Sequence, residues 1–254
     1  MDIWHSIVLG IVEGVTEFLP ISSTGHLILV GDFLKISPTD FTKSFDIIIQ
    51  LGAISAVIIL YWKTLCNVEM IKKLLVAFIP TGIIGLALYK TVKTYFIGNE
   101  GIVLLSMLVG GVVLIAFEFW HKKSEIAVSE VGAISYRQAV AIGLFQSIAI
   151  IPGVSRSAAT IVGGLLLGLK RKAIVEFSFL LAVPTMLAAS GLDLVKNYSL
   201  FSVDQIGVLA VGFVFALFTA GFSIKFLLSY IQNHNFIPFG VYRIIVAFVY
   251  FFVL

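Results

Sequence analysis

Six runs of apolar residues, each close to the length that crosses a bilayer, dominate this chain. A spanning helix needs about 20 consecutive, mostly apolar residues. The runs are Ser44–Trp62, Ile71–Tyr89, Ile102–Trp120, Ile174–Leu194, Ile206–Ile231 and Phe236–Leu254. Charged residues make up only 12% of the chain, about half of what a soluble domain carries. The pattern predicts an all-α polytopic membrane protein in which residues 1–254 form one integral membrane domain.

Two further apolar regions, Met1–Leu34 and Ser135–Leu169, are interrupted near their middle by proline, glycine and hydroxyl residues. Irregular backbone at membrane depth is tolerated only where protein or a polar cavity satisfies its hydrogen bonds. We therefore expect each region to form a re-entrant hairpin of two half-helices. The first region lacks a basic start and carries two glutamates, so we expect it to be retained rather than cleaved as a signal peptide.

A weak internal repeat relates the two interrupted regions. A shift of 133 residues aligns Gly10 with Gly143, Glu13 with Gln146, Ser22 with Ser155, Ile28 with Ile161 and Gly31 with Gly164. Each half, residues 1–120 and 134–254, then holds one re-entrant hairpin and three spans. Because three is odd, the second half inserts upside down relative to the first. Inverted repeats of this kind bring broken helices together near the midplane, around one site.

Basic residues in the predicted loops orient this arrangement. The face opposite the N-terminus holds nine, namely Lys63, Lys72, Lys73, Lys122, Lys123, Arg137, Lys170, Arg171 and Lys172. The N-terminal face holds five, namely Lys35, Lys43, Lys90, Lys93 and Lys196. Positively charged loops stay in the cytoplasm, so both termini are expected outside. The net charge of +3 is no argument for a nucleic acid partner, and none is expected.

The first interrupted region carries two carboxylates, Glu13 and Glu17, on one helical face. Like charges at this spacing repel, and burial makes the repulsion worse. A bound cation or a proton held by one carboxylate would relieve it. Since ionisable groups inside membrane segments are functional by default, we expect the pair to hold a divalent cation, Mg²⁺ or Ca²⁺, against a phosphate.

A run of small polar residues, Ser22-Ser23-Thr24-Gly25-His26, follows Pro20. Proline ends one half-helix and the hydroxyl residues cap the next, whose free amides form an anion site. We therefore expect Ser22 and Thr24 to contact a phosphate. His26 is suited to act as a general acid or base, or to activate a serine such as Ser23.

The second interrupted region repeats this pattern with a basic residue, Ser155-Arg156-Ser157, after Pro152-Gly153. Arginine recognises phosphate in a bidentate manner, and Thr160 lies one turn further along the same face. We expect Ser155, Ser157 and Thr160 to add hydroxyl contacts to the phosphate. The alternative role of Arg156 is a structural ion pair with Glu13 or Glu17.

Other features are less informative or exclude whole classes. Arg243 and Lys225 lie nearer the ends of apolar runs and are interpreted as interface anchors or structural partners. Cys66 is the only cysteine, which rules out a disulfide within the chain. The sequence lacks a P-loop, a cysteine–histidine zinc cluster and the G-x-S-x-G nucleophile elbow.

At these residues the chain resembles the undecaprenyl pyrophosphate phosphatase family, the membrane phosphatases linked to bacitracin resistance. The stretch Glu-Gly-x-Thr-Glu-Phe-Leu-Pro-x-Ser-Ser-Thr-Gly-His at Glu13–His26 matches the family's first signature throughout. Pro-Gly-x-Ser-Arg-Ser at Pro152–Ser157, followed by Thr160, matches the second. Ala158 departs from the glycine that is usual there. The resemblance covers the whole chain in length, order and number of segments.

The resemblance implies hydrolysis of undecaprenyl diphosphate to undecaprenyl phosphate and phosphate, which recycles the lipid carrier for cell-wall synthesis. It also implies a divalent cation and a site on the outer face of the bacterial cytoplasmic membrane. Its functional positions fall on Glu13, Glu17, Ser23, His26, Arg156, Ser155 and Thr160.

Several alternatives stay open on the sequence alone. The nucleophile is either Ser23 assisted by His26, or a water deprotonated by Glu17 or His26. A rival function is a lipid-phosphate flippase or ion-coupled anion carrier, since inverted repeats and broken helices are typical of transporters. The clustered serine, histidine and glutamate favour chemistry over transport. The oligomeric state is also open, with a homodimer as one arrangement.

Overall fold

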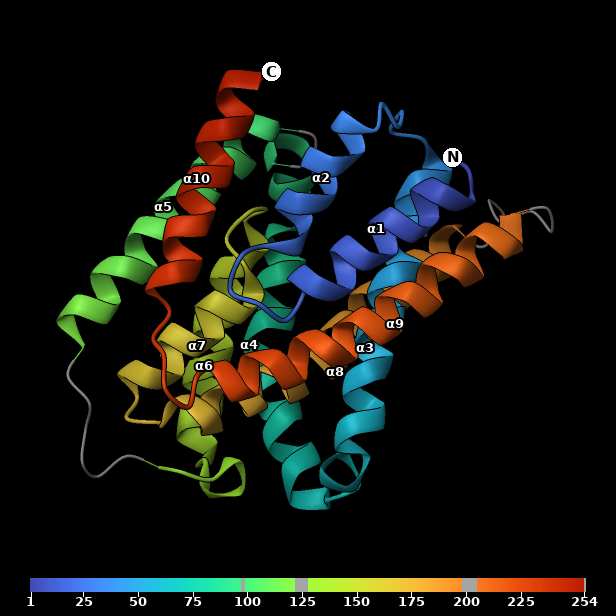
Figure 1. The fold of residues 1–254 in the computed structure, drawn as a ribbon. Coiled ribbons are helices and arrows are strands. Elements are labelled where there is room, and N and C mark those ends of the chain that lie inside the picture. The colour runs from blue at the N-terminus through green and yellow to red at the C-terminus, as the bar shows by residue number, and fades with distance from the viewer. Residues whose placement is uncertain (97–98, 122–127, 198–204, 254) are drawn as a thin grey trace.

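The computed structural model describes residues 1–96, 99–121, 128–197 and 205–253, and these ranges are almost entirely helical (Figure 1). Within them lie ten α-helices. They are α1 (Ile3–Thr16), α2 (Ser23–Phe33), α3 (Asp40–Leu65), α4 (Val68–Thr91), α5 (Glu100–Trp120), α6 (Tyr136–Ser147), α7 (Arg156–Leu166), α8 (Arg171–Asn197), α9 (Ile206–Tyr230) and α10 (Ile237–Val253). The predicted all-α class is thus confirmed.

Five of these helices, α3, α4, α5, α8 and α9, are long and apolar enough to cross a membrane by length and composition. They correspond to five of the six predicted spans. The sixth predicted span, Phe236–Leu254, is also an apolar helix, but α10 has 17 residues and falls short of that length. Leu254 itself lies outside the described residues.

Both interrupted regions break where the sequence predicts. The first consists of α1 and α2, and the second of α6 and α7. In each, the serine that caps the second half-helix has left-handed backbone, with φ of 74° at Ser22 and 71° at Ser155. Its hydroxyl accepts a hydrogen bond from the amide three residues on, from Gly25 at 3.4 Å and from Ala158 at 3.2 Å. Such backbone costs about 1–3 kcal/mol at a non-glycine residue. Contacts with the surrounding structure must therefore offset this cost at both serines.

Each first half-helix packs along a long helix from the other half of the chain. In Figure 1, α1 lies beside α9, and α6 likewise contacts α4. Glycines make both contacts close, because a Cβ atom on Gly10 would lie 2.6 Å from the Gly212 carbonyl oxygen. A Cβ atom on Gly143 would lie 1.9 Å from the Ala77 carbonyl oxygen. Small residues allow this approach of backbones in membrane proteins.

The helix α8 runs through the middle of the bundle, and residues 173–183 within it are buried apart from the partly exposed Glu176. Its residues Phe177, Phe179, Leu180 and Leu181 are fully inaccessible and belong to the largest apolar cluster. A stretch that is apolar on every face belongs in a core. Ser178 lies within this stretch and is equally buried, and its hydroxyl oxygen is 2.7 Å from Thr160 Oγ1 of the second hairpin.

Candidate active site

An ion pair joins the tips of the two hairpins. The Nη2 atom of Arg156, at the start of α7, lies 3.3 Å from Oε1 of Glu17, at the end of α1. Both side chains are largely buried, with 12% and 7% of their surface exposed. The structure thus brings together the predicted acidic and basic residues from positions 139 apart in the sequence.

The hydroxyl of Ser23 donates a hydrogen bond to Oε2 of the same Glu17 carboxylate. Ser23 is the first residue of α2 and is buried. One carboxylate therefore accepts from a serine of its own hairpin and from the arginine of the other. A hydroxyl beside a base that a third group orients is the geometry of an activated nucleophile.

His26 lies one turn beyond Ser22 and contacts other partners. Its Nδ1 atom is 2.8 Å from the Ser22 carbonyl oxygen, and its Nε2 atom is 2.9 Å from the hydroxyl of Tyr242 on α10. Since a carbonyl oxygen can only accept, Nδ1 carries a proton, and in the neutral ring Nε2 accepts from the Tyr242 hydroxyl. Both ring nitrogens are thus engaged away from Ser23. The sequence indicated His26 as the base for Ser23 and Glu17 only as a base for water, whereas in the structure the base that Ser23 contacts is Glu17.

Two predicted phosphate contacts, Ser157 and Thr160, are fully buried and already have protein partners. The hydroxyl of Ser157 donates to the Phe18 carbonyl oxygen at 2.9 Å, a second tie between the hairpin tips. Thr160 Oγ1 lies 2.7 Å from Ser178 Oγ and donates to the Arg156 carbonyl oxygen at 3.0 Å. These hydroxyls hold the second hairpin in place, and their contact with a phosphate stays a prediction.

The other three predicted phosphate contacts lie at the half-helix starts. The hydroxyls of Ser22 and Ser155 cap α2 and α7, as described above. Thr24 is exposed, and no hydrogen bond of its side chain occurs among the described residues. Their roles toward a phosphate also stay predictions.

Glu13 lies one turn before Glu17 and is completely buried. Neither of its carboxylate oxygens has a hydrogen-bond partner within the described part of the chain. Asp46 of α3, Glu17 and Arg156 are near enough to interact with it electrostatically. A buried carboxylate without a partner is costly, so this position calls for a ligand or a proton.

Arg243 of α10 is the largest fully buried side chain in the described ranges. Its guanidinium donates to the carbonyl oxygens of Met107, Pro20, Val154, Ser106 and Gly153, at 2.8–3.4 Å. Pro20 belongs to the tip of the first hairpin, and Gly153 and Val154 belong to the second. The sequence interpretation of Arg243 as a structural partner is confirmed, although its contact with both hairpin tips was missed.

The family model of bacitracin resistance protein BacA matches residues 6–249 of this chain. The chain belongs to this family. It is 53% identical over 251 residues to a relative from Persephonella marina, with 98% of each chain covered. It is 51% identical to relatives from a Sulfurihydrogenibium species and from Wolinella succinogenes, and here 99% or more of each chain is covered. All three relatives are named undecaprenyl-diphosphatase.

The site residues can be compared with the ligands that the expected divalent cation would need. No group of three or more histidine, cysteine, aspartate or glutamate residues that could hold a metal occurs in the described ranges. Mg²⁺, however, is often held by one or two carboxylates together with substrate oxygens and water. The free buried oxygens of Glu13, one turn from Glu17, fit that smaller set.

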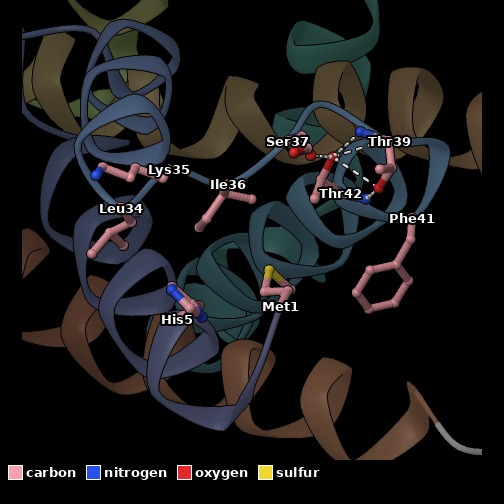
Figure 2. Close-up of a pocket in the computed structure, with 9 residues that line it drawn as sticks. All are labelled: Met1, His5, Leu34, Lys35, Ile36, Ser37, Thr39, Phe41 and Thr42. Carbon is pink, nitrogen blue, oxygen red and sulfur yellow. Dashed lines mark hydrogen bonds between the residues drawn. The ribbon is translucent and has the colours of Figure 1, made fainter.

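A separate hollow of about 240 Å³ lies between the N-terminus and the turn from α2 to α3 (Figure 2). It is lined by Met1, His5 and residues of the 34–42 turn, where Thr42 Oγ1 donates to the Thr39 carbonyl oxygen at 2.8 Å. None of the candidate site residues lines it. The residues that match the BacA signatures therefore gather between the hairpin tips and not at this surface.

Sequence reasoning missed Ser178, Tyr242 and Asp46 in this BacA site. Ser178 accepts a hydrogen bond from Arg156 Nη1 through its carbonyl oxygen at 2.8 Å. The signal for Asp46 was available, because an acidic residue inside an apolar run is functional by default. Ser178 and Tyr242 carry no such signal, since single hydroxyls are common in membrane helices.

Proposed function

We propose that this protein is an undecaprenyl-diphosphatase, which hydrolyses undecaprenyl diphosphate to undecaprenyl phosphate and inorganic phosphate. The activity recycles the lipid carrier for cell-wall synthesis and gives resistance to bacitracin. Family membership and the name of relatives that match along the whole chain support it. The single observation that carries the chemistry is the hydroxyl of Ser23 on the carboxylate of Glu17, which Arg156 holds from the other hairpin.

In this mechanism Ser23 is the nucleophile and Glu17 is its base. As Ser23 Oγ bonds to the terminal phosphorus, its proton passes to Glu17 and the bond from phosphorus to the bridging oxygen breaks. Undecaprenyl phosphate leaves with the bridging oxygen and its electron pair. The leaving undecaprenyl phosphate takes the proton from Glu17, which can then deprotonate a water. That water attacks the phosphorus and breaks its bond to Ser23 Oγ, and Glu17 returns a proton to Oγ as phosphate leaves. The contact between Ser23 and Glu17 in this structure supports this route over one that begins at His26.

Arg156 stabilises the charge that develops on the transferred phosphoryl group. Its Nη atoms contact Glu17 and Ser178, while its buried Nε has no partner in the described ranges. An unused donor on a fixed guanidinium is available to a phosphoryl oxygen. A preorganised donor of this kind stabilises a transition state more than a solvated one does.

Glu13 and Glu17 are proposed to hold the divalent cation, Mg²⁺ or Ca²⁺. The bound cation supplies positive charge that offsets the negative charge of the diphosphate. Glu13 is suited to this because neither of its oxygens is used by the protein. Glu17 then serves both the cation and Ser23.

The proposed architecture has six spans and two re-entrant hairpins, in inverted halves of residues 1–120 and 134–254. The exchanged packing of α1 on α9 and α6 on α4 supports it, as do the matching serine caps. The charge bias of the loops supports an orientation with both termini outside, and family membership supports a bacterial cytoplasmic membrane with the site on its outer side. Of the residues in that count, Lys122 and Lys123 lie outside the described ranges.

The test is cation-dependent phosphate release from polyprenyl diphosphates by purified protein in detergent micelles. We expect turnover by the unmodified protein and loss of turnover in Glu17→Ala. A flippase or anion carrier would release no phosphate there, because it breaks no bond in the diphosphate and micelles hold no gradient for it to act on. Trapping of phosphoserine at Ser23 would support the covalent route. Incorporation of one labelled water oxygen without that intermediate would support direct attack by water.

A further inference from the structure

His26 is held at both ring nitrogens by groups from different parts of the chain. The Ser22 carbonyl oxygen, one turn earlier in the first hairpin, binds Nδ1. The hydroxyl of Tyr242, 216 residues away on α10, binds Nε2. The two rings are also stacked, with centroids 5.4 Å apart and planes only 3° from parallel. The imidazole thus has a fixed tautomer, a fixed plane and an occupied lone pair.

The contact between these two residues is specific to the hydroxyl of Tyr242. A phenylalanine would stack on His26 equally well but would leave Nε2 without a donor. Without that donor, the Ser22 carbonyl oxygen would be the only hydrogen-bond anchor of a buried ring with 7% of its surface exposed. An imidazole held at one end can rotate, and an unpaired buried nitrogen is costly.

We propose that Tyr242 is a positioning residue of the site, whose hydroxyl holds His26 with its proton on Nδ1 and with neither ring nitrogen bonded to Ser23. The hydroxyl of Ser23 is then free to donate its hydrogen bond to Glu17. The inference rests on the proposed function for its effect on turnover. Its effect on the state of the imidazole does not depend on that function.

Tyr250 provides a matched control on the same helix. It lies about two turns after Tyr242, and its hydroxyl donates to Asp32, near the end of α2. Both tyrosines therefore join α10 to α2, but only Tyr242 reaches His26. If α10 only needs a hydroxyl to dock on α2, both phenylalanine variants will behave alike.

The experiment measures turnover and the ¹⁵N resonances of the His26 ring in detergent. In the unmodified protein we expect one protonated nitrogen, Nδ1, and an Nε2 resonance typical of a hydrogen-bonded acceptor. Tyr242→Phe should shift that Nε2 resonance and lower kcat by about threefold to tenfold, the size of one hydrogen bond, with little change in KM. Tyr250→Phe should leave the His26 resonances unchanged.

A double substitution separates positioning from general support of the fold. If Tyr242 acts through His26, adding Tyr242→Phe to His26→Ala should slow turnover no further. An equal slowing in both backgrounds, or unchanged His26 resonances in Tyr242→Phe, would overturn the proposal. Absence of phosphate release by the unmodified protein would instead refute the proposed function, and the ring resonances would still test the hydrogen bond.

Discussion

The two hairpins share one backbone design and carry opposite chemistry. Ser22 and Ser155 both start a half-helix from left-handed backbone and cap it through the same hydroxyl-to-amide bond. The next residue is the nucleophile candidate Ser23 in one hairpin and Arg156 in the other. The acidic groups and the candidate nucleophile thus come from one hairpin and the guanidinium from the other. Neither hairpin alone holds a complete phosphate site.

The difference is clearest at two positions that the internal repeat aligns, Glu13 and Gln146. Gln146 is buried and its amide nitrogen donates to Thr81 at 2.9 Å and Thr185 at 3.2 Å, while its Oε1 has no partner among the described residues. Glu13 is equally buried, and no described residue satisfies its oxygens. The neutral amide joins its hairpin to α4 and α8. A buried carboxyl group with neither oxygen bonded calls for a ligand or a proton instead.

The largest expected effect comes from removing the ion pair that joins the hairpins. Arg156→Ala and Glu17→Ala should each lower kcat by at least about a hundredfold, because each removes a preorganised charge next to the reacting phosphate. Phosphate release by purified protein at saturating cation measures it. Circular dichroism and gel filtration check that each variant folds. Turnover close to normal in either folded variant would remove that residue from the mechanism.

The second expected effect tests the contrast between Glu13 and Gln146 directly. Glu13→Gln gives the first hairpin the side chain of the second and should weaken the apparent affinity for Mg²⁺ by about tenfold to a hundredfold, since one carboxylate ligand is lost. A Mg²⁺ titration of phosphate release measures this affinity. The matched control, Gln146→Leu, should change stability and leave the Mg²⁺ dependence as it was. Equal Mg²⁺ dependence in Glu13→Gln and the unmodified protein would argue against a cation at Glu13.

A smaller effect should follow from removing the second hydrogen bond between the hairpin tips, from Ser157 to Phe18. Ser157→Ala removes the bond to the Phe18 carbonyl oxygen and should lower stability by about 1–3 kcal/mol, because that oxygen stays buried without a donor. Ser147→Ala is the control, since the Ser147 hydroxyl donates to the Gly143 carbonyl oxygen of its own helix and to no other residue in the described ranges. Denaturant titration of both variants measures the difference. The idea fails if the two variants lose the same stability.

The smallest effect should appear at the matching caps. Ser22→Ala and Ser155→Ala should each lower stability by about 1 kcal/mol, the usual value of a helix N-cap. Ser22→Gly and Ser155→Gly should lose less, because glycine adopts left-handed backbone freely. The same denaturant titration applies. If alanine costs more stability than glycine at one of these serines but less at the other, the backbone strain differs between the two positions.

Local features of the sequence predicted much of this fold. The apolar runs marked five long helices and a shorter sixth, and the broken runs marked both hairpins within a few residues. These predictions succeed because helix length, proline and serine caps act through neighbours in the chain. The acidic residues Glu13 and Glu17 and the basic Arg156 were also recognisable, since charges are rare at membrane depth.

Only the tertiary structure decided how these groups are paired. Nothing local to Ser23 indicates that its hydroxyl meets Glu17 while His26 turns to Tyr242, more than 200 residues away. The same holds for Arg243, which joins both hairpin tips through carbonyl oxygens that no sequence pattern marks. Side-chain periodicity predicts which face of a helix is buried. The packing of α10 against both hairpins determines which atoms meet there, because hydrogen bonds depend on distance in space and not on separation along the chain.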